Sequence, residues 1–249
     1  GSSSSVHPWA DANWSSHLMT VYDAADLVAQ GVTGPVLITE LRFRPDATTS
    51  GSWLARTSPD VKIDLSTCPV DYTAITTTFA ANRGVDVRRV FEGAVTIPAG
   101  SIGPNPQPWY VTIPFSTPFF YDPSAGDLVV EVRRDSSPWD GGPRASDLAF
   151  TTATSTPHAS TLYTTSPTSA TGSSLFYGAG AVCGMTCAPV PGLYGAFRVS
   201  ATTGATPLTV TFTQACYSTT PGAQLTWQWD LDGDGADFLP HLRGPGGPA

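Results

Sequence analysis

Apolar and polar residues alternate with a period of two along several short stretches of the chain, and this pattern restricts the fold more than any other feature. Successive side chains of a β-strand point to opposite faces of its sheet, so alternation predicts a strand with one buried face. In residues 36–44, for example, Leu37, Leu41 and Phe43 share the face that we expect to be buried. The same pattern predicts further strands at residues 19–22, 60–65, 87–97, 109–115, 127–133, 147–152, 160–163 and 175–177.

Turn-forming sequences separate these strands, among them RPDATTSG, IPAGSIGPNPQP, YDPSAGD and SPWDGGPR. In residues 127–133 the alternation places Leu128, Val130 and Val132 on one face and Val129, Glu131 and Arg133 on the other, as expected for a half-buried strand of an antiparallel sheet. Many short strands with closely spaced turns predict an all-β protein, a jelly-roll-like antiparallel sandwich. The one predicted helix covers residues 24–30, with Asp23 as its N-cap and Gly31 after its end.

The composition excludes several classes of protein. Charged residues make up 13% of the chain, about half of the usual share, which argues against a helical bundle or coiled coil. The net charge of −8 argues against binding to nucleic acid or to an anionic lipid surface, both of which need basic patches. No apolar run is long enough to span a bilayer, so we expect no membrane insertion.

Four cysteines and a single lysine, Lys62, favour an oxidising, extracellular compartment. Three disulfide pairings exist for four cysteines. The short spacing favours a bond between Cys183 and Cys187, which leaves Cys68 to pair with Cys216. A zinc site is the rival interpretation, but the spacings contain no CxxC motif.

The sequence changes character near CAPVPG, at residues 187–192. We therefore expect a β-sandwich domain over residues 1–190 and a second segment over residues 191–249. Residues 151–174 are rich in Ser, Thr and Pro, which is typical either of a surface loop or of an O-glycosylated stretch.

Residues 194–237 contain FRVSATTG, TPLTVTFT and LTWQWDLDGDG, and with these motifs they resemble the first half of a PKD-type immunoglobulin-like domain. The resemblance implies strands at residues 196–201, 208–213 and 225–230, with Trp229 buried. It covers less than a fifth of the chain, and WDLDGDG is its most specific part.

An immunoglobulin-like sandwich has about seven strands, whereas three are predicted here. The segment is therefore expected to be an incomplete sandwich whose unpaired strand edges are covered by the first domain or by another chain. PKD-type modules of secreted bacterial proteins act as spacers or binding accessories, so the resemblance implies a non-catalytic, extracellular role. Residues 1–190 look similar to uncharacterised β-sandwich modules that accompany such repeats.

Asp230, Asp232 and Asp234 alternate and are followed by Gly235, as in the opening of a calcium-binding loop. The twelfth position is a histidine, so only Asp237 is placed to close the site. An acidic β-turn is the alternative interpretation. Calcium is the one cofactor that the sequence suggests.

Catalytic signatures such as HExxH, GxSxG and a phosphate-binding loop are missing, so we expect no enzymatic activity. Trp53 and Trp139 lie between turn residues and are the best candidates for stacking on a sugar. Packing in the core is the alternative role for both side chains.

These observations support two hypotheses. The first is a non-enzymatic, extracellular structural subunit that self-assembles into a filament or surface layer through β-strand edges, with copies of itself as partners. In this hypothesis either residues 2–22, which show no fold signal of their own, or the C-terminal tail reaches across a subunit boundary. The alternative is a carbohydrate-binding or adhesion module of a secreted bacterial protein, with a polysaccharide as its partner.

Overall fold

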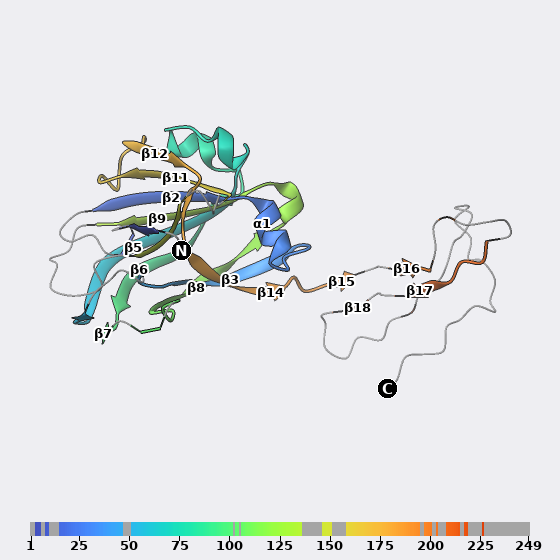
Figure 1. Cartoon of the computed structure of the whole chain (residues 1–249). Helices are drawn as coiled ribbons and strands as arrows, with labels where there is room; N and C mark the ends of the chain where they lie inside the picture. The colour runs from blue at the N-terminus through green and yellow to red at the C-terminus, as the bar shows by residue number, and fades with distance from the viewer. Residues whose placement is uncertain are drawn as a thin grey trace. The chain divides into compact units, whose positions relative to one another are not determined.

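The structure is a computed structural model, and it divides into two compact units, Gly1–Pro189 and Val190–Ala249 (Figure 1). The predicted domain boundary, after residue 190, lies one residue from this division. The structure describes residues 3–5, 8–9, 15–46, 51–101, 103–104, 106–135, 146–150, 158–194, 197–200, 203, 208–214, 217–218 and 226.

A six-stranded antiparallel sheet forms one layer of the first unit. From one edge to the other its strands are β12 (Ser174–Tyr177), β11 (Ala159–Thr164), β2 (Ser16–Tyr22), β9 (Leu128–Arg134), β5 (Arg56–Thr67) and β6 (Arg88–Ile97). Every neighbouring pair is antiparallel, as the alternating sequence pattern requires.

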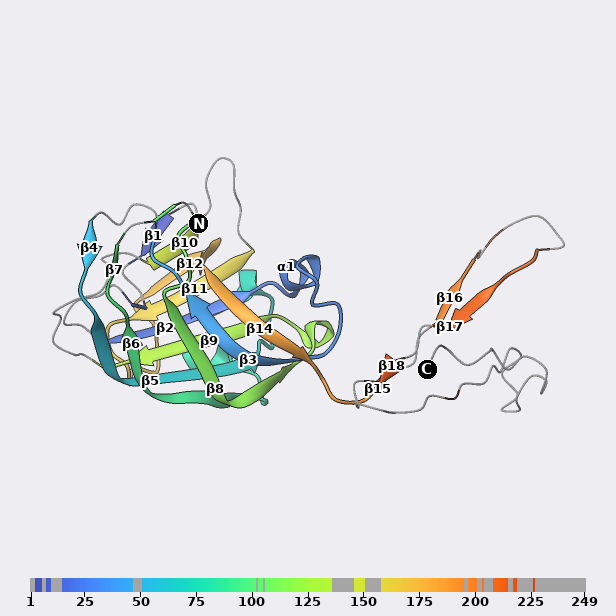
Figure 2. The same cartoon turned by 90° about the horizontal axis from the view of Figure 1, so that it is seen from below.

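The second layer contains two three-stranded antiparallel sheets, whose strands cross those of the first layer in Figure 2. One has the order β14 (Cys183–Pro189), β3 (Val36–Phe43) and β8 (Val111–Tyr121). The other has the order β1 (Ser3–Ser5), β10 (Ser146–Phe150) and β13 (Ala179–Ala181). A short ladder joins β4 (Ser52–Trp53) to β7 (Gly100–Ser101). The predicted all-β antiparallel sandwich is therefore confirmed.

Each stretch predicted to be a strand in residues 1–190 contains one, and the predicted helix is α1 (Ala24–Ala29). The side chain of Asp23 accepts a hydrogen bond from the backbone N–H of Ala25 at 2.8 Å, which caps this helix. Gly31 follows at a φ of 103°, a conformation that favours glycine. Three 3₁₀ helices were not predicted: η1 (Tyr72–Ala74), η2 (Phe79–Asn82) and η3 (Pro123–Ala125).

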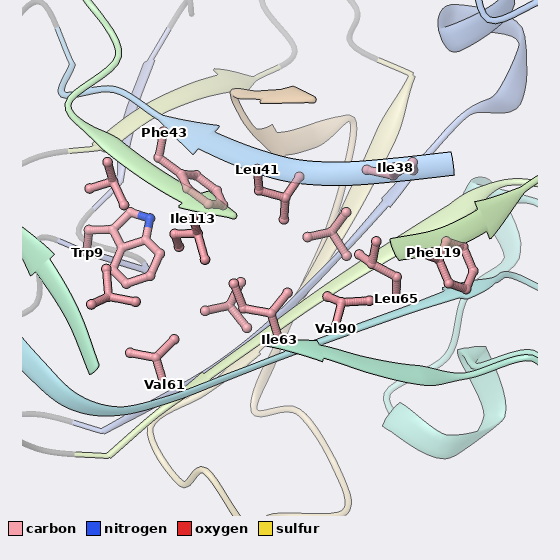
Figure 3. Packing of buried hydrophobic residues seen from close by; sticks show 14 of the residues in the cluster. Trp9, Ile38, Leu41, Phe43, Val61, Ile63, Leu65, Val90, Ile113 and Phe119 are labelled. Atoms are coloured by element: carbon pink, nitrogen blue, oxygen red, sulfur yellow. The ribbon is translucent and has the colours of Figure 1, made fainter. Parts of the chain in front are cut away.

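The main hydrophobic core fills the space between the two layers. Figure 3 shows Ile63 and Leu65 from β5 opposite Leu41 from β3. In β3 the buried side chains are Ile38, Leu41 and Phe43, so the prediction for Leu37 is wrong. The pairing of β3 with β8 shifts register between Ile38 and Glu40, and a bulge of this kind reverses the faces of the residues before it.

A second hydrophobic cluster lies on the other side of the six-stranded sheet. The segment between β5 and β6, residues 68–87, covers this outer face, and we call it the cap segment. Its Ile75 and Phe79 pack with Met19, Val129 and other residues of the sheet. As a result Glu131 of β9 is only 1% exposed, and the predicted solvated face of this strand is wrong at that position.

The N-terminal segment is part of the first unit. Strand β1 pairs with β10 of the same chain, and Trp9 is fully buried in the main core. Two buried arginines hold the backbone there: Arg56 Nη1 donates to the Trp9 carbonyl at 3.0 Å, and Arg134 Nε donates to the Pro8 carbonyl at 3.1 Å. Within the chain the described residues of this segment thus pair and pack in the first unit, and its expected crossing to a neighbouring subunit stays a prediction.

Two short antiparallel pairs are described in the second unit. Strand β15 (Leu193–Tyr194) pairs with β18 (Tyr217–Ser218), and β16 (Phe197–Val199) pairs with β17 (Phe212–Gln214). Strand β16 lies within the predicted range 196–201, and β17 overlaps the end of the range 208–213. Of the third predicted strand, only Thr226 belongs to the described residues, and Trp229 lies outside them. No helix in the described part of the chain is long and apolar enough to cross a membrane.

Candidate functional site

Most of the site residues predicted in the second unit fall outside the described residues. These are Asp230, Asp232, Asp234, Asp237 and Cys216, and in the first unit Trp139. Within the described ranges, no group of three or more His, Cys, Asp or Glu side chains is arranged to hold a metal ion. Calcium binding at the aspartates therefore stays a prediction.

The predicted disulfide bond between Cys183 and Cys187 is wrong, because both residues are free thiols. They lie in the extended strand β14. At about 3.3 Å per residue, four residues separate their Cα atoms by roughly 13 Å, about twice the distance that a disulfide spans. Cys68 is also a free thiol, buried in the second hydrophobic cluster, and its predicted partner Cys216 lies outside the described residues, so that pairing stays a prediction.

The thiols are poor nucleophiles. Burial raises the pKa of Cys183 to about 11, and its Sγ donates a hydrogen bond to the Tyr22 hydroxyl at 3.3 Å. That hydroxyl in turn donates to the Ala181 carbonyl at 2.6 Å. Burial also raises the pKa of Cys68 and of Cys187. Since the thiolate is the reactive form, these groups lack the activation that a catalytic cysteine needs.

Trp53 is half-buried, and contacts on several sides fix its indole ring. Its Nε1 donates to the Pro98 carbonyl at 3.0 Å, and its ring meets Tyr110 edge-on at a centroid distance of 6.2 Å. The cross-strand partner of Trp53 is Gly100. A Cβ atom at Gly100 would lie 2.6 Å from the indole, so only glycine lets the ring lie against the backbone there. The structure thus provides a fixed, partly exposed aromatic ring.

Exposed hydroxyl groups lie on this ladder and on the ladder between β5 and β6. Thr57 and Thr96 are cross-strand partners with 2.9 Å between their Oγ1 atoms, and Ser52 pairs with Ser101. All four residues are exposed. An indole ring beside hydroxyl groups can stack on a sugar and hydrogen-bond to it, whereas a purely structural tryptophan needs no such neighbours.

Trp109 is less accessible on its ring faces than its 38% exposure implies. The guanidinium carbon of Arg44 lies 5.0 Å from the centre of the indole, a cation–π contact. A Cβ atom at Gly184 would lie 3.1 Å from the same ring. Arg44 Nε donates to Asp147 at 2.5 Å, which holds the guanidinium in place.

The largest group of ionisable side chains lies on the outer face of the six-stranded sheet, beside the cap segment. His17 Nε2 lies 2.5 Å from Glu131 Oε1, and Arg83 of the cap segment donates two hydrogen bonds to the same carboxylate at 2.7 and 2.6 Å. Burial by itself would raise the pKa of Glu131. The hydrogen bonds from His17 and Arg83, together with the charge of Arg83, outweigh burial and lower it to about 2.

A second buried carboxylate, Asp64, continues this cluster. Arg89 Nε donates to it at 2.5 Å, and Arg133 contacts its other oxygen. Both carboxylates therefore form ion pairs with arginines, and the ring of Phe79 stacks on the imidazole of His17. Arg83 thus joins the cap segment to the sheet, and both carboxylates already bind cations, whereas His17 Nδ1 is buried without a hydrogen-bond partner.

The strand edges differ in how well they are protected against pairing with another chain. Strand β8 carries Pro114 and Pro118, and β14 has a bulge and ends at Pro189. Strand β6 has two register shifts and charged side chains. Bulges, prolines and charges are the devices by which natural sheets blunt their edges.

Strand β12 has none of these devices. Among the strands that the structure describes, it pairs only with β11, and it forms the rim of the six-stranded sheet in Figure 1. It exposes 46% of Phe176 and 52% of Tyr177. Residues 148–197 contain no Asp, Glu, Lys or Arg, although the chain has a net charge of −8. This uncharged edge was visible in the sequence as a charge-free stretch, but its position in the sheet was not.

Comparisons of the chain with protein-family models, with curated proteins and with solved structures give no match. The resemblance of residues 194–237 to a PKD-type domain therefore stays a prediction.

Proposed function

We propose that the protein is a non-enzymatic, extracellular structural subunit that associates with copies of itself through a β-strand edge. The observation that carries this proposal is the edge strand β12, which is uncharged and has two exposed aromatic side chains. An edge without charge, proline or bulge is a template for strand addition. Natural proteins avoid such edges unless another strand covers them.

The state of the ionisable groups supports a non-enzymatic role. Catalytic sites hold groups whose pKa is matched to proton transfer or nucleophilic attack. In the described part of the chain, the thiols have raised pKa values and the carboxylate of Glu131 has a pKa of about 2. These shifts hold each group in one protonation state near neutral pH.

The extracellular assignment rests on composition and on the PKD resemblance, since the predicted disulfide bond between Cys183 and Cys187 is not formed. An acidic, hydroxyl-rich chain with one lysine is compatible with that location. Localisation of the tagged full chain in its native host, by fractionation of cells and medium, tests this part of the proposal.

The test of self-association is sedimentation velocity of the full chain over a hundredfold range of concentration, followed by negative-stain electron microscopy. We expect the mean sedimentation coefficient to rise with concentration and ordered assemblies to appear. A single monomeric species at every concentration would contradict the proposal. A denatured and refolded sample serves as the control for aggregation of misfolded protein.

A second candidate function, carbohydrate binding, is favoured by the arrangement of Trp53. Its indole is held against Gly100, and exposed threonine and serine hydroxyls occur on its own ladder and on the ladder between β5 and β6. Affinity electrophoresis in gels that contain soluble polysaccharides provides the test. Trp53→Ala should abolish retardation by any polysaccharide that slows the native chain, whereas Leu54→Ala, at a neighbouring side chain that is 70% exposed, should not. Equal retardation of both variants would exclude Trp53 as the binding residue.

A further inference from the structure

We infer that the partner strand on β12 is β12 of a second copy, in an antiparallel pair with Phe176 on the two-fold axis. This inference rests on the proposed function and names the surface and the register through which two copies meet. Identical strands that pair antiparallel generate a closed two-fold dimer. The two six-stranded sheets would then form one continuous sheet across the interface.

Charge favours a second copy as the occupant of this edge. Two identical surfaces meet at a two-fold axis, so every charge near the axis faces a copy of itself. In a chain with a net charge of −8, repulsion opposes most such contacts. Residues 148–197 contribute β11, β12 and β13 without a single Asp, Glu, Lys or Arg, so the paired strands themselves bring no like charges together.

The two faces of β12 restrict the register. Leu175 pairs with Leu162, which packs in the outer cluster, so Leu175 is on the outer face. Tyr177 is also on the outer face, because its hydroxyl donates to the Ile75 carbonyl of the cap segment at 3.0 Å. Phe176 lies between them and faces the opposite side, where its partner Thr161 donates to Ala179 of the second layer at 2.8 Å.

In a continuous sheet, residues directly opposite one another must lie on the same face. Leu175 can therefore face Tyr177 of the second copy but cannot face its Phe176. Two registers keep this rule with three residues of each strand paired, one centred on Leu175 and one centred on Phe176, and only the second brings both exposed aromatic side chains, Phe176 and Tyr177, into the pair. Leu175 and Tyr177 then pair twice on the outer face, where they extend the cluster under the cap segment. Paired aromatic and aliphatic side chains are the contacts that stabilise neighbouring strands.

Cysteine cross-linking tests both the partner and the register. Opposite residues of an antiparallel pair have Cβ atoms about 4.5–5.5 Å apart, close enough for a disulfide bond after small adjustments. Under mild oxidation Phe176→Cys should give a covalent dimer, and mass spectrometry of its peptides should show a bond from residue 176 to residue 176. Leu175→Cys and Tyr177→Cys should each stay monomeric alone and should cross-link when mixed. A bond from residue 175 to residue 175 would overturn the register.

A charge substitution in β12 shows whether copies of the chain associate through this strand or through another surface. Phe176→Lys places two like charges on the axis and should raise the dissociation constant of the dimer at least tenfold. The matched control is Val85→Lys, which adds the same charge at a fully exposed position of the cap segment. If the native chain associates and Phe176→Lys associates equally well, another surface is used and only this inference fails. If the native chain never associates, the proposed function fails.

Discussion

The phenyl ring of Phe79 lies flat on the imidazole of His17, with the ring centroids 3.5 Å apart and the planes at 9°. This contact joins the cap segment to strand β2 directly beside the ion pair between Arg83 and Glu131. The cap segment is therefore held by a stacked pair, a buried ion pair and the second hydrophobic cluster at one place.

Removal of the Phe79 ring should loosen the cap segment. Phe79→Ala should destabilise the first unit by about 3–5 kcal/mol, as for other buried aromatic residues. Because the loss is local, amide hydrogen exchange measured by mass spectrometry should accelerate most in residues 68–87. Val85→Ala, in the same segment but fully exposed, is the control and should leave exchange unchanged. Uniform acceleration over the whole unit would show that the cap segment and the sandwich unfold together.

The lowered pKa of Glu131 predicts how the free energy of unfolding depends on pH. Its pKa falls from an ordinary value of 4.5 to about 2 in the folded chain. A depressed carboxyl pKa stabilises the fold at pH values above the unfolded value, and this stabilisation disappears as the pH falls from about 4.5 to about 2. A shift of this size corresponds to about 3 kcal/mol.

The measurement is urea unfolding of the native chain and of Glu131→Gln between pH 2 and pH 7. The free energy of unfolding of the native chain should fall below about pH 4.5. Glu131→Gln should be less stable than the native chain at pH 7, and its free energy of unfolding should change less between pH 4.5 and pH 2. The control is Lys62→Gln. The ion pair between Lys62 and Asp60 lies at the surface, and exposed ion pairs contribute little to the free energy of unfolding. Identical pH profiles for the native chain and Glu131→Gln would refute this role.

The cysteines should react at different rates with a maleimide under native conditions. Cys187 is exposed, whereas Cys68 is buried and Cys183 is enclosed beside Tyr22, so Cys187 should be modified well before the other two. Raised thiol pKa values slow all three reactions at neutral pH. Peptide mapping of the labelled protein identifies the sites, and Cys187→Ser should remove the fast phase at that site. A bond between Cys183 and Cys187 in a non-reducing map would contradict the extended geometry of β14.

Calcium binding at Asp230, Asp232 and Asp234 stays a prediction that titration calorimetry can test. Without a closing glutamate, the dissociation constant should lie at the weak end of the calcium-binding range, about 0.1–1 mM. Asp232→Asn together with Asp234→Asn should abolish the heat of binding. Submicromolar affinity would mean that a further carboxylate completes the site.

Alternation in the sequence was enough to locate the strands of the sandwich, because one face of each strand packs in the core. It was insufficient where a second layer or a bulge intervened. Glu131 looked solvated, because nothing in its own strand indicates that residues 68–87 fold over it. Leu37 was assigned to the core in place of Ile38, because a bulge changes the face of a side chain without a change in the local pattern.

The cysteines illustrate a different limit. Two cysteines four residues apart fit a short disulfide loop as well as they fit an extended strand, and only the pairing of β14 with β3 distinguishes the two. Strand β12 was predicted correctly, but its place at the rim of the sheet depends on contacts between residues far apart in the chain. The candidate assembly edge therefore became visible only with the topology.

The N-terminal segment provides the last prediction. Trp9 is fully buried, meets the ring of Phe43 edge-on at a centroid distance of 5.3 Å, and is held through its carbonyl by Arg56. Trp9→Ala should therefore destabilise the first unit by about 3–5 kcal/mol, in the range of buried aromatic residues.

Deletion of residues 1–17 also removes the first two residues of strand β2, and it takes away the backbone carbonyls of Pro8 and Trp9, to which Arg134 and Arg56 donate. Loss of these two hydrogen bonds together with the buried Trp9 side chain should destabilise the truncated chain more than Trp9→Ala does. Circular dichroism and thermal melts of the native chain, Trp9→Ala and the truncated chain measure this order of stability. A truncated chain that melts at the native temperature would show that the segment contributes nothing to the core.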